Sequence, residues 1–487
     1  MKHFFVLLFV ATSFLNAESN RASIVLRHVA VIDTAAGTIQ QDMAVVITND
    51  HISDMGKLAE VKVPESADVI DAAGKYLIPG LWDMHVHIFS GDRFSIDSRL
   101  LVANGITGVR DMGTHIPLAT VNGIRRQIAE GKLLGPRIVA AGPVVDGEFK
   151  DWTNLNVSTP DEARQAVRLL KQQGADFIKV YDNLSREAYF AIADESRKAG
   201  IPFAGHVPWT ISTQEASAAG QKSIEHLVGI LPVCSTKEAE ILRQYDEAFK
   251  EPDFSTANVK GVRADILAAD TFSEERCSKI AAIFRVNATW QCPTLTEQSA
   301  SYAYDAMSMT KDWRLKYISK QRLLDWAPDN DVFVKRFAAA DKEGRLRLYR
   351  RLVELAGALN RNGVEFLAGT DLGRPFIFAG FSLHDELALL VRAGFTQGEA
   401  LKTATYNPAK FLGMLDRLGT VEKGKMADLV LLDANPLEDI HNTQKIRAVI
   451  LNGRYFDRAE LDKLLADAES NVANHLTRAT GRVRRPR

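Results

Sequence analysis

The chain has two kinds of hydrophobic pattern, and they separate its two ends from its centre. Short apolar runs rich in valine and isoleucine, divided by Gly, Asn and Asp turns, fill residues 23–69 and return at 419–454. Such runs are typical of β-strands. Because the same texture occurs at both ends, we predict one small β-sandwich domain made of residues 18–80 plus 412–456.

The centre, residues 81–411, alternates short apolar segments with amphipathic helical stretches. This alternation indicates parallel strands joined by crossover helices. Eight such segments predict an α/β fold with a closed (β/α)8 barrel of the TIM type. Long charged stretches at about 235–286 and 301–359 exceed what a crossover needs, so we expect helical excursions there. The eight segments are 81–88, 106–112, 136–142, 176–182, 201–207, 221–227, 288–295 and 364–371.

The two termini differ from both regions. Residues 1–17 are interpreted as a cleaved signal peptide, because Lys2 precedes an apolar run from Phe4 to Leu15 and Ala17 is a small residue suited to cleavage. That run is shorter than the roughly 20 residues needed to span a bilayer. We therefore expect a secreted or periplasmic protein, with a buried first strand or an uncleaved anchor as the alternative. Residues 457–487 predict a helix followed by a basic tail.

Composition narrows the class of partner. Hydrophobic residues make up 46% of the chain and charged residues 25%, which is ordinary for a globular protein. Lys and Arg number 60 against 61 Asp and Glu, so the net charge is −1 and no overall field attracts nucleic acid or an anionic membrane. We expect a small-molecule or peptide substrate, no nucleic acid and no membrane span, and leave a homo-oligomer open.

Candidate chemistry begins at the end of the first central segment, where His85 and His87 are two residues apart. The period of two along a strand sends both side chains to one face, which in a small barrel is the interior. A packed or exposed histidine pair is the simpler interpretation. The position at the carboxyl end of a barrel strand, where barrel active sites are built, favours a metal site.

Lys179 lies inside the apolar segment DFIKVYD, where an unpaired ammonium would be costly to bury. A salt bridge or snorkelling would explain it. Burial can also lower the pKa of an amine, and a neutral amine can capture carbon dioxide to form a carbamate. His206 and His226 end the fifth and sixth segments, and Asp371 ends the eighth. Each alone could be structural, but together they place ligand-type residues at the same end of five strands.

The motifs DMHVH, DFIKVYD, AGHV, SIEHL and AGTD, in this order, resemble the amidohydrolase superfamily. The resemblance covers nearly the whole mature chain and includes the C-terminal segment GTVEKGKMADLVLLDANPLEDI. The chain is most similar to the imidazolonepropionase-related and prolidase-like (Xaa-Pro dipeptidase-type) enzymes. Members with a lysine on the fourth strand hold two divalent metals and hydrolyse dipeptides or N-acyl amino acids. The loops VYDNLSRE and VPWTIS depart from the Gly-rich and His-Gly loops of many prolidase-like members.

The resemblance also implies a role for each ligand. His85, His87 and Asp371 correspond to ligands of the more buried metal, and His206 and His226 to those of the more exposed one. Lys179 corresponds to the bridging N6-carboxylysine, which incorporates carbon dioxide. Asp371 would also be the catalytic residue, accepting a proton from water and passing it to the leaving amine. Zinc suits these ligands, and manganese, iron or cobalt are compatible.

Three further residues are candidates for substrate binding. Tyr181, two residues beyond Lys179, and Arg374, just after Asp371, would bind a substrate carboxylate. A packed barrel tyrosine and a surface-loop charge are the alternatives. His384, where the eighth helix is expected to begin, would contact substrate, with capping or packing as the alternative.

The sequence thus predicts a binuclear metal hydrolase that cleaves an amide bond in a dipeptide or N-acyl amino acid. A cyclic-amide hydrolase or a deaminase is the alternative enzyme, although a deaminase usually needs one metal and no bridging lysine. A non-catalytic binding protein on the same fold is a third possibility, which the complete ligand set disfavours.

Overall fold

The structure is a computed structural model. It describes residues 23–89, 93–147, 154–251, 253–303, 311–326 and 342–481. The expected signal peptide, 1–17, and the last residues of the basic tail, 482–487, lie outside the described residues, as do parts of the second expected excursion. None of the described helices is long and apolar enough to cross a membrane.

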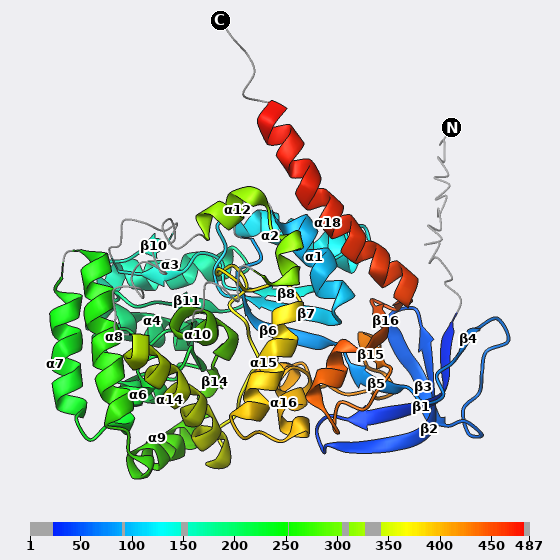
Figure 1. The fold of residues 1–487 in the computed structure, drawn as a ribbon, viewed down its shortest axis with the longest axis horizontal. Helices are drawn as coiled ribbons and strands as arrows, with labels where there is room; N and C mark the ends of the chain where they lie inside the picture. Colours follow the sequence, from blue (N-terminus) through cyan, green and yellow to red (C-terminus); the bar gives the residue numbers. More distant parts are fainter. Residues whose placement is uncertain are drawn as a thin grey trace, which may run out of the picture.

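Strands from both chain ends pair in one sheet beside the central region (Figure 1). The order is β17-β16-β15-β5-β1-β2-β3, with β4 paired to β1. The two ends of the chain meet where β5 and β15 pair antiparallel, with Ile78 opposite Val430. By its pairing this is one continuous sheet, because β1 pairs with β2 on one edge and with β4 and β5 on the other. The strands are β1 Ile24–Asp33, β2 Thr38–Thr48, β3 His51–Lys57, β4 Asp68–Asp71, β5 Tyr76–Pro79, β15 Leu429–Leu432, β16 Ile446–Leu451 and β17 Arg454–Phe456.

This sheet has a core of its own, which includes Leu26, Val45, Leu77, Leu431 and Ile450. All five are buried, and they come from β1, β2, β5, β15 and β16. Apolar residues from both ends of the chain therefore hold the sheet together.

The central region contains parallel strands in two sheets, ordered β6-β7-β8 and β10-β9-β11-β12-β13-β14. Seven of the eight predicted segments contain a strand, and the short strands β9 and β10 were not predicted. The strands are β6 Leu81–Val86, β7 Ile106–Asp111, β8 Arg137–Ala140, β9 Val145–Asp146, β10 Leu155–Asn156, β11 Ile178–Val180, β12 Phe203–Gly205, β13 Ser223–Glu225 and β14 Trp290–Cys292.

The eighth predicted segment, 364–371, forms no continuous strand, yet it lies between the two sheets. Phe366 bridges Gln291 of β14, and Leu372, just beyond the segment, bridges Val86 of β6, both in parallel. Backbone bonds from Leu367 to Gln291 and from Met84 to Ala368 add to these contacts. The fold is therefore mixed α/β with parallel strands, and no closed sheet is recorded among the described residues.

Helices surround the central strands, and α7, α8, α9 and α14 lie together on one side of the molecule (Figure 1). Helices α7, α8 and α9 cover most of the first excursion, and α14 from the second packs against α8 and α9. The remaining helices connect strands or follow the last sheet. Their bounds are α1 Phe94–Ala103, α2 Leu118–Ala129, α3 Pro160–Gln172, α4 Arg186–Ala199, α5 Thr213–Ala218, α6 Ile230–Cys234, α7 Glu238–Phe249, α8 Phe254–Asp270, α9 Glu274–Asn287, α10 Leu295–Tyr302, η1 Trp313–Tyr317, α12 Lys320–Asp325, α14 Lys342–Arg361, α15 Phe381–Arg392, α16 Gln397–Thr403, α17 Tyr406–Leu412, η2 Ile440–Gln444 and α18 Arg458–Gly481.

Candidate active site

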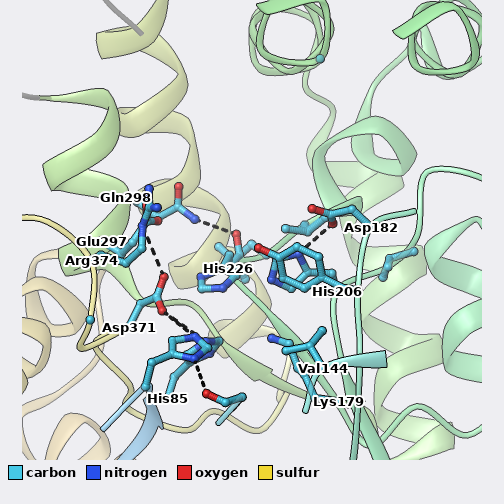
Figure 2. Close-up of a pocket in the computed structure, with 18 of the residues that line it drawn as sticks. His85, Val144, Lys179, Asp182, His206, His226, Glu297, Gln298, Asp371 and Arg374 are labelled. Atoms are coloured by element: carbon cyan, nitrogen blue, oxygen red, sulfur yellow. Dashed lines mark hydrogen bonds and ion pairs between the residues drawn. The ribbon is translucent and has the colours of Figure 1, made fainter. Parts of the chain in front are cut away.

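A cavity of about 1200 Å³ opens at the carboxyl ends of the parallel strands. All six residues predicted as metal ligands line it, and all of them except His87 are labelled in Figure 2. His85 lies near the end of β6 and Lys179 lies on β11, whereas His206 and His226 directly follow β12 and β13. Because parallel strands end at one edge, residues far apart in the sequence meet there.

The four histidines share one arrangement: each Nδ1 faces a fixed protein group. The Nδ1 atoms of His85, His87, His206 and His226 lie 2.9 Å from Glu225 Oε2, 3.1 Å from the Gly113 carbonyl oxygen, 2.7 Å from Asp182 Oδ1 and 2.6 Å from Thr294 Oγ1, respectively. Such partners fix the orientation of a metal-binding histidine and leave Nε2 for the metal. The arrangement therefore fits a set of ligands.

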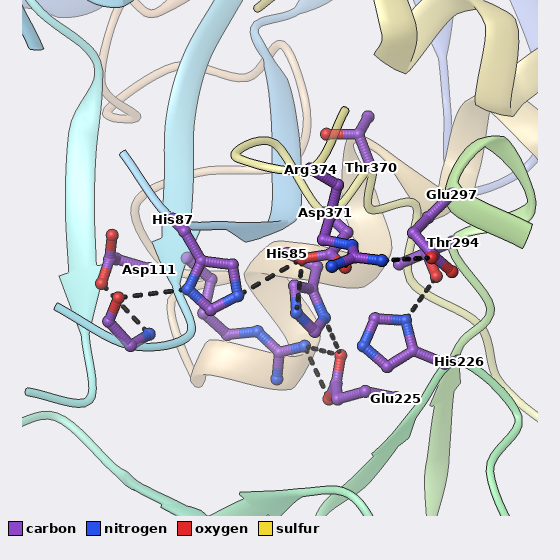
Figure 3. Close-up of polar contacts among 12 residues, drawn as sticks. His85, His87, Asp111, Glu225, His226, Thr294, Glu297, Thr370, Asp371 and Arg374 are labelled. Carbon is purple, nitrogen blue, oxygen red and sulfur yellow. Dashed lines mark hydrogen bonds and ion pairs between the residues drawn. The ribbon is translucent and has the colours of Figure 1, made fainter. Parts of the chain in front are cut away.

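His85 is held by a buried network that the sequence analysis missed. Glu225 contacts His85 Nδ1 and accepts hydrogen bonds from Arg110 Nη2 at 2.9 and 3.0 Å (Figure 3). Arg110 also donates to the Met84 carbonyl oxygen at 2.6 Å. The Arg110 guanidinium helps to hold the pKa of the Glu225 carboxyl well below its usual range, against the effect of burial. Glu225 and Arg110 could have been identified from the sequence in the same way as Lys179, because each is a charged residue within an apolar strand segment.

His226 has a strained backbone, with φ of 59°, and the segment after β14 holds it. Its backbone N–H donates to the Cys292 carbonyl oxygen at 2.8 Å, and its backbone carbonyl oxygen accepts from Gln298 Nε2 at 2.9 Å. The start of α10 is held in turn by Glu386 of α15. Its carboxylate accepts bonds from the backbone of Leu295 at 2.9 Å and Thr296 at 2.7 Å.

Asp371 lies between the first two histidines. Its Oδ1 is 3.5 Å from His85 Nε2 and 3.3 Å from His87 Nε2. Burial opposes ionisation, but His85 and the other nearby histidines hold the pKa of Asp371 well below its usual range. Burial lowers the pKa of His85 to about 4, so its ring is neutral at physiological pH. A charged oxygen and neutral imidazoles are the states that bind cations.

Three buried polar atoms at this place have no hydrogen-bond partner within the described ranges: His85 Nε2, Asp371 Oδ1 and Lys179 Nζ. The ligand atoms of His85, His226 and Asp371 lie within 4.8 Å of one another. Buried polar atoms normally form hydrogen bonds, so a cluster of such atoms without them requires an explanation. A divalent cation supplies one, and the residues present therefore fit a metal site.

Lys179 is almost fully buried, at 1% exposure. Burial lowers the pKa of its amine to about 8. Its Nζ lies 5.6 Å from the centre of the Tyr181 ring. A substantial fraction of the amine is therefore neutral near pH 8, which is the form that reacts with carbon dioxide.

Two of the three predicted substrate contacts line the cavity. Tyr181 packs on His206 with ring centres 4.1 Å apart. Arg374 Nη2 lies 3.6 Å from Glu297, and its Nε lies 3.9 Å from Asp371. Glu297, Gln298 and Tyr302 of α10 also line the cavity, and the sequence analysis missed them because they lie beyond the seventh predicted barrel segment.

His384 does not belong to this group, which corrects its prediction as a substrate contact. It is buried on α15, with Nδ1 2.9 Å from Thr443 Oγ1 and Nε2 3.0 Å from the Asn104 carbonyl oxygen. Both ring nitrogens thus have protein partners, and the residue is not among those lining the cavity. Its role is packing between α15 and its neighbours, which was the alternative interpretation.

Comparison with known proteins identifies the family of this chain. The model of the Amidohydrolase family matches residues 76–236 and 338–455. Imidazolonepropionase from Pseudomonas aeruginosa (strain UCBPP-PA14) is 24% identical over 415 residues, which cover 83% of this chain and 91% of that protein.

Two solved structures have the same fold. Bottromycin amidohydrolase superposes with a TM-score of 0.70 at 25% identity, covering 93% of this chain and 91% of that one. A Xaa-Pro dipeptidase with methionine bound in its active site gives a TM-score of 0.62 at 22% identity, covering 90% and 100%. The expected resemblance is therefore confirmed. The chain belongs to the amidohydrolase family and is a hydrolase that acts on carbon–nitrogen bonds.

Proposed function

We propose that this enzyme is a binuclear metal hydrolase that releases an amino acid from a dipeptide or an N-acyl amino acid. The observation that carries the proposal is the set of buried, unpartnered ligand atoms in a cavity that also contains a cation, Arg374. The family uses divalent metals, and the donor set here fits them.

The residues divide between two metal positions. His85, His87 and Asp371 would hold one ion, and His206 and His226 the other, with a carboxylated Lys179 between them. Bound there, divalent cations would act as Lewis acids toward the scissile carbonyl group and the attacking water. We also infer that the two parallel sheets belong to one (β/α)8 barrel, which the bridges at Phe366 and Leu372 support.

Asp371 would move the proton. Its low pKa keeps the carboxylate ionised at neutral pH, so it can accept a proton from the attacking water. Donation of that proton to the departing nitrogen would release the amine and return Asp371 to its starting state. The fixed positions of His85 and His87, each held through Nδ1, keep this carboxylate in place.

Arg374 and Tyr181 would select the substrate. Arg374 lines the cavity 3.6 Å from Glu297 and 3.9 Å from Asp371, and its guanidinium has the geometry for a bidentate contact with a substrate carboxylate. A substrate with a free α-carboxylate would place its amide nitrogen toward the histidines. Such a contact is worth roughly 1.5 to 3 kcal/mol, or about ten- to a hundredfold in selectivity.

The test is a screen of dipeptides and N-acyl amino acids with metal-loaded protein, each offered as the free acid and as the C-terminal amide. We expect two metals per chain, amine release from the acids, and poor turnover of the amides. Arg374→Ala should narrow the ratio of acid to amide turnover, and Arg347→Ala, on the exposed side of α14, should leave it unchanged. Equal turnover of acids and amides would contradict this proposal and favour a cyclic-amide hydrolase.

A further inference from the structure

One wall of the cavity is built by α6 and by helices of the two excursions. Figure 1 places α7, α8 and α14 together on one side of the molecule. The cavity-lining side chains that these helices and α6 contribute are mostly apolar. They include Leu231, Val233, Val262, Leu348 and Leu352. All five are buried, so this wall offers a binding surface for an apolar group.

Trp209 joins this wall to the metal side of the cavity. It lies three residues after His206, and its backbone N–H donates to the Asp182 carbonyl oxygen at 3.2 Å. Its ring centre is 6.0 Å from that of Tyr245 on α7. A Cβ atom at Gly261 of α8 would lie only 3.4 Å from the Trp209 ring. The loop that carries His206 therefore packs directly on the two helices, so the apolar wall is continuous with the site.

A single carboxylate, that of Asp265, stands in this apolar wall. It lies one helical turn after Gly261 on α8 and lines the cavity. Tyr245 Oη donates a hydrogen bond to Oδ1. No salt bridge to Asp265 occurs in the part of the chain that the structure describes. Burial and the hydrogen bond from Tyr245 are the two influences on the pKa of its carboxyl group. We call Trp209, Tyr245, Val262, Asp265, Leu348 and Leu352 the Asp265 pocket.

Apolar packing does not explain why a charged side chain, Asp265, occurs in this wall. Burial raises the pKa of Asp265 to about 6, so the carboxylate is still mostly ionised at neutral pH. An ionised carboxylate that is half-buried without a cation is unfavourable. A ligand that brought a positive charge to Oδ2 would remove this cost, whereas a neutral ligand of the same shape would leave the charge unpaired.

We propose that the Asp265 pocket binds a substrate group with an apolar stem and a protonated amine or a guanidinium at its end. The stem would lie along Val262, Leu348 and Leu352, and the cation would meet Asp265. This inference rests on the proposed function and specifies its substrate class. The same cation can be supplied by the side chain of the released amino acid or by the acyl part of the substrate, and the experiment separates these two sources.

The experiment uses two series of substrates with constant stem length. In the first, the released amino acid is lysine, norleucine or N6-acetyllysine, each N-acetylated. In the second, leucine carries a 6-aminohexanoyl or a hexanoyl group. We expect the charged member of one series to have a kcat/KM about ten- to a hundredfold above its neutral partner.

Asp265→Asn should abolish this preference and change turnover of the neutral members little, because an amide oxygen can still accept the bond from Tyr245. Asp265→Lys should disfavour the charged substrates below the neutral ones. Asp270→Asn, on the same helix but in an exposed pair with Arg347, is the matched control and should keep the wild-type preference. A preference that survives in Asp265→Asn, or that is absent in both series, would overturn the inference.

Calorimetry separates this inference from the proposed function. Lysine, norleucine, 6-aminohexanoate and hexanoate are each titrated into the metal-loaded protein. The affinity of lysine is compared with that of norleucine, and the affinity of 6-aminohexanoate with that of hexanoate. Tighter binding of the charged member that is lost in Asp265→Asn supports the pocket even if no amide in the screen is hydrolysed. Equal binding of both members, in protein that hydrolyses the neutral substrates, refutes the pocket and leaves the proposed function standing.

Discussion

Replacing Lys179 by methionine should stabilise the metal-free protein while abolishing its activity. The amine is 1% exposed, and its Nζ has no hydrogen-bond partner among the described residues. Without metal and carbon dioxide, the folded chain must bury either an ammonium or an amine that has given up its proton. Methionine has a similar length and carries no charge, so it fills the same space without this cost.

The magnitude follows from the pKa of Lys179. Burial lowers it from 10.5 to about 8, and each factor of ten in proton affinity is worth about 1.4 kcal/mol, which gives about 3 kcal/mol. A lysine whose pKa is lower in the folded state destabilises that state fully at a pH below the folded value. The penalty decreases as pH rises from about 8 to 10.5, because in this range the folded chain has already released the proton that the unfolded chain still holds. Lys179→Met should therefore gain about 3 kcal/mol at pH 7 and progressively less toward pH 10.5.

The assay is urea unfolding of chelator-treated protein in carbonate-free buffer at pH 7, 8.5 and 10, followed by circular dichroism. Lys222→Met is the matched control, because Lys222 is also partly buried but donates to the Phe411 carbonyl oxygen at 2.5 Å. Removing that bond should leave stability unchanged or lower. A Lys179→Met protein that is less stable than wild type at pH 7, or whose difference does not vary with pH, would refute the reasoning.

The other predictions test single contacts. Asp371→Asn should retain metal but lose about 10²- to 10⁴-fold in kcat, because an amide cannot accept the proton; turnover at the wild-type rate would contradict the assignment. Glu386→Gln should reduce the amount of metal bound at His226, since an amide cannot accept both backbone bonds at the start of α10. Full metal occupancy in this variant would contradict the idea that Glu386 holds His226 in place through α10. Gly205→Ala should lower Tm strongly, because φ is +141° and a Cβ would lie 2.1 Å from the Val180 carbonyl oxygen. Gly200→Ala should lower Tm much less, because a Cβ at Gly200 would have no atom within 4 Å. Equal decreases in Tm would exclude the steric explanation.

The sequence by itself determined where the candidate ligands lie along the chain. A histidine pair two residues apart, a lysine inside an apolar segment and polar residues at segment ends are local patterns, readable without knowing what packs against them. Parallel strands end at one edge, so these patterns also implied that the side chains would meet. The division into a two-ended sheet and a central α/β region was readable for the same reason, because strand and helix periods are properties of neighbouring residues.

Only the tertiary structure decided which groups surround those ligands. Glu225 and Arg110 meet from strands 115 residues apart in the sequence, and Glu386 reaches the backbone of α10 from 90 residues away. His384 has the same residue type as the ligands, but its helix turns it toward Thr443 and Asn104. Asp265 appeared in the sequence as one charge on an amphipathic helix, and only the packing of α8 beside Trp209 brought it into the cavity. Helix faces and long-range contacts depend on which surfaces pack together, and that information is spread over the whole chain.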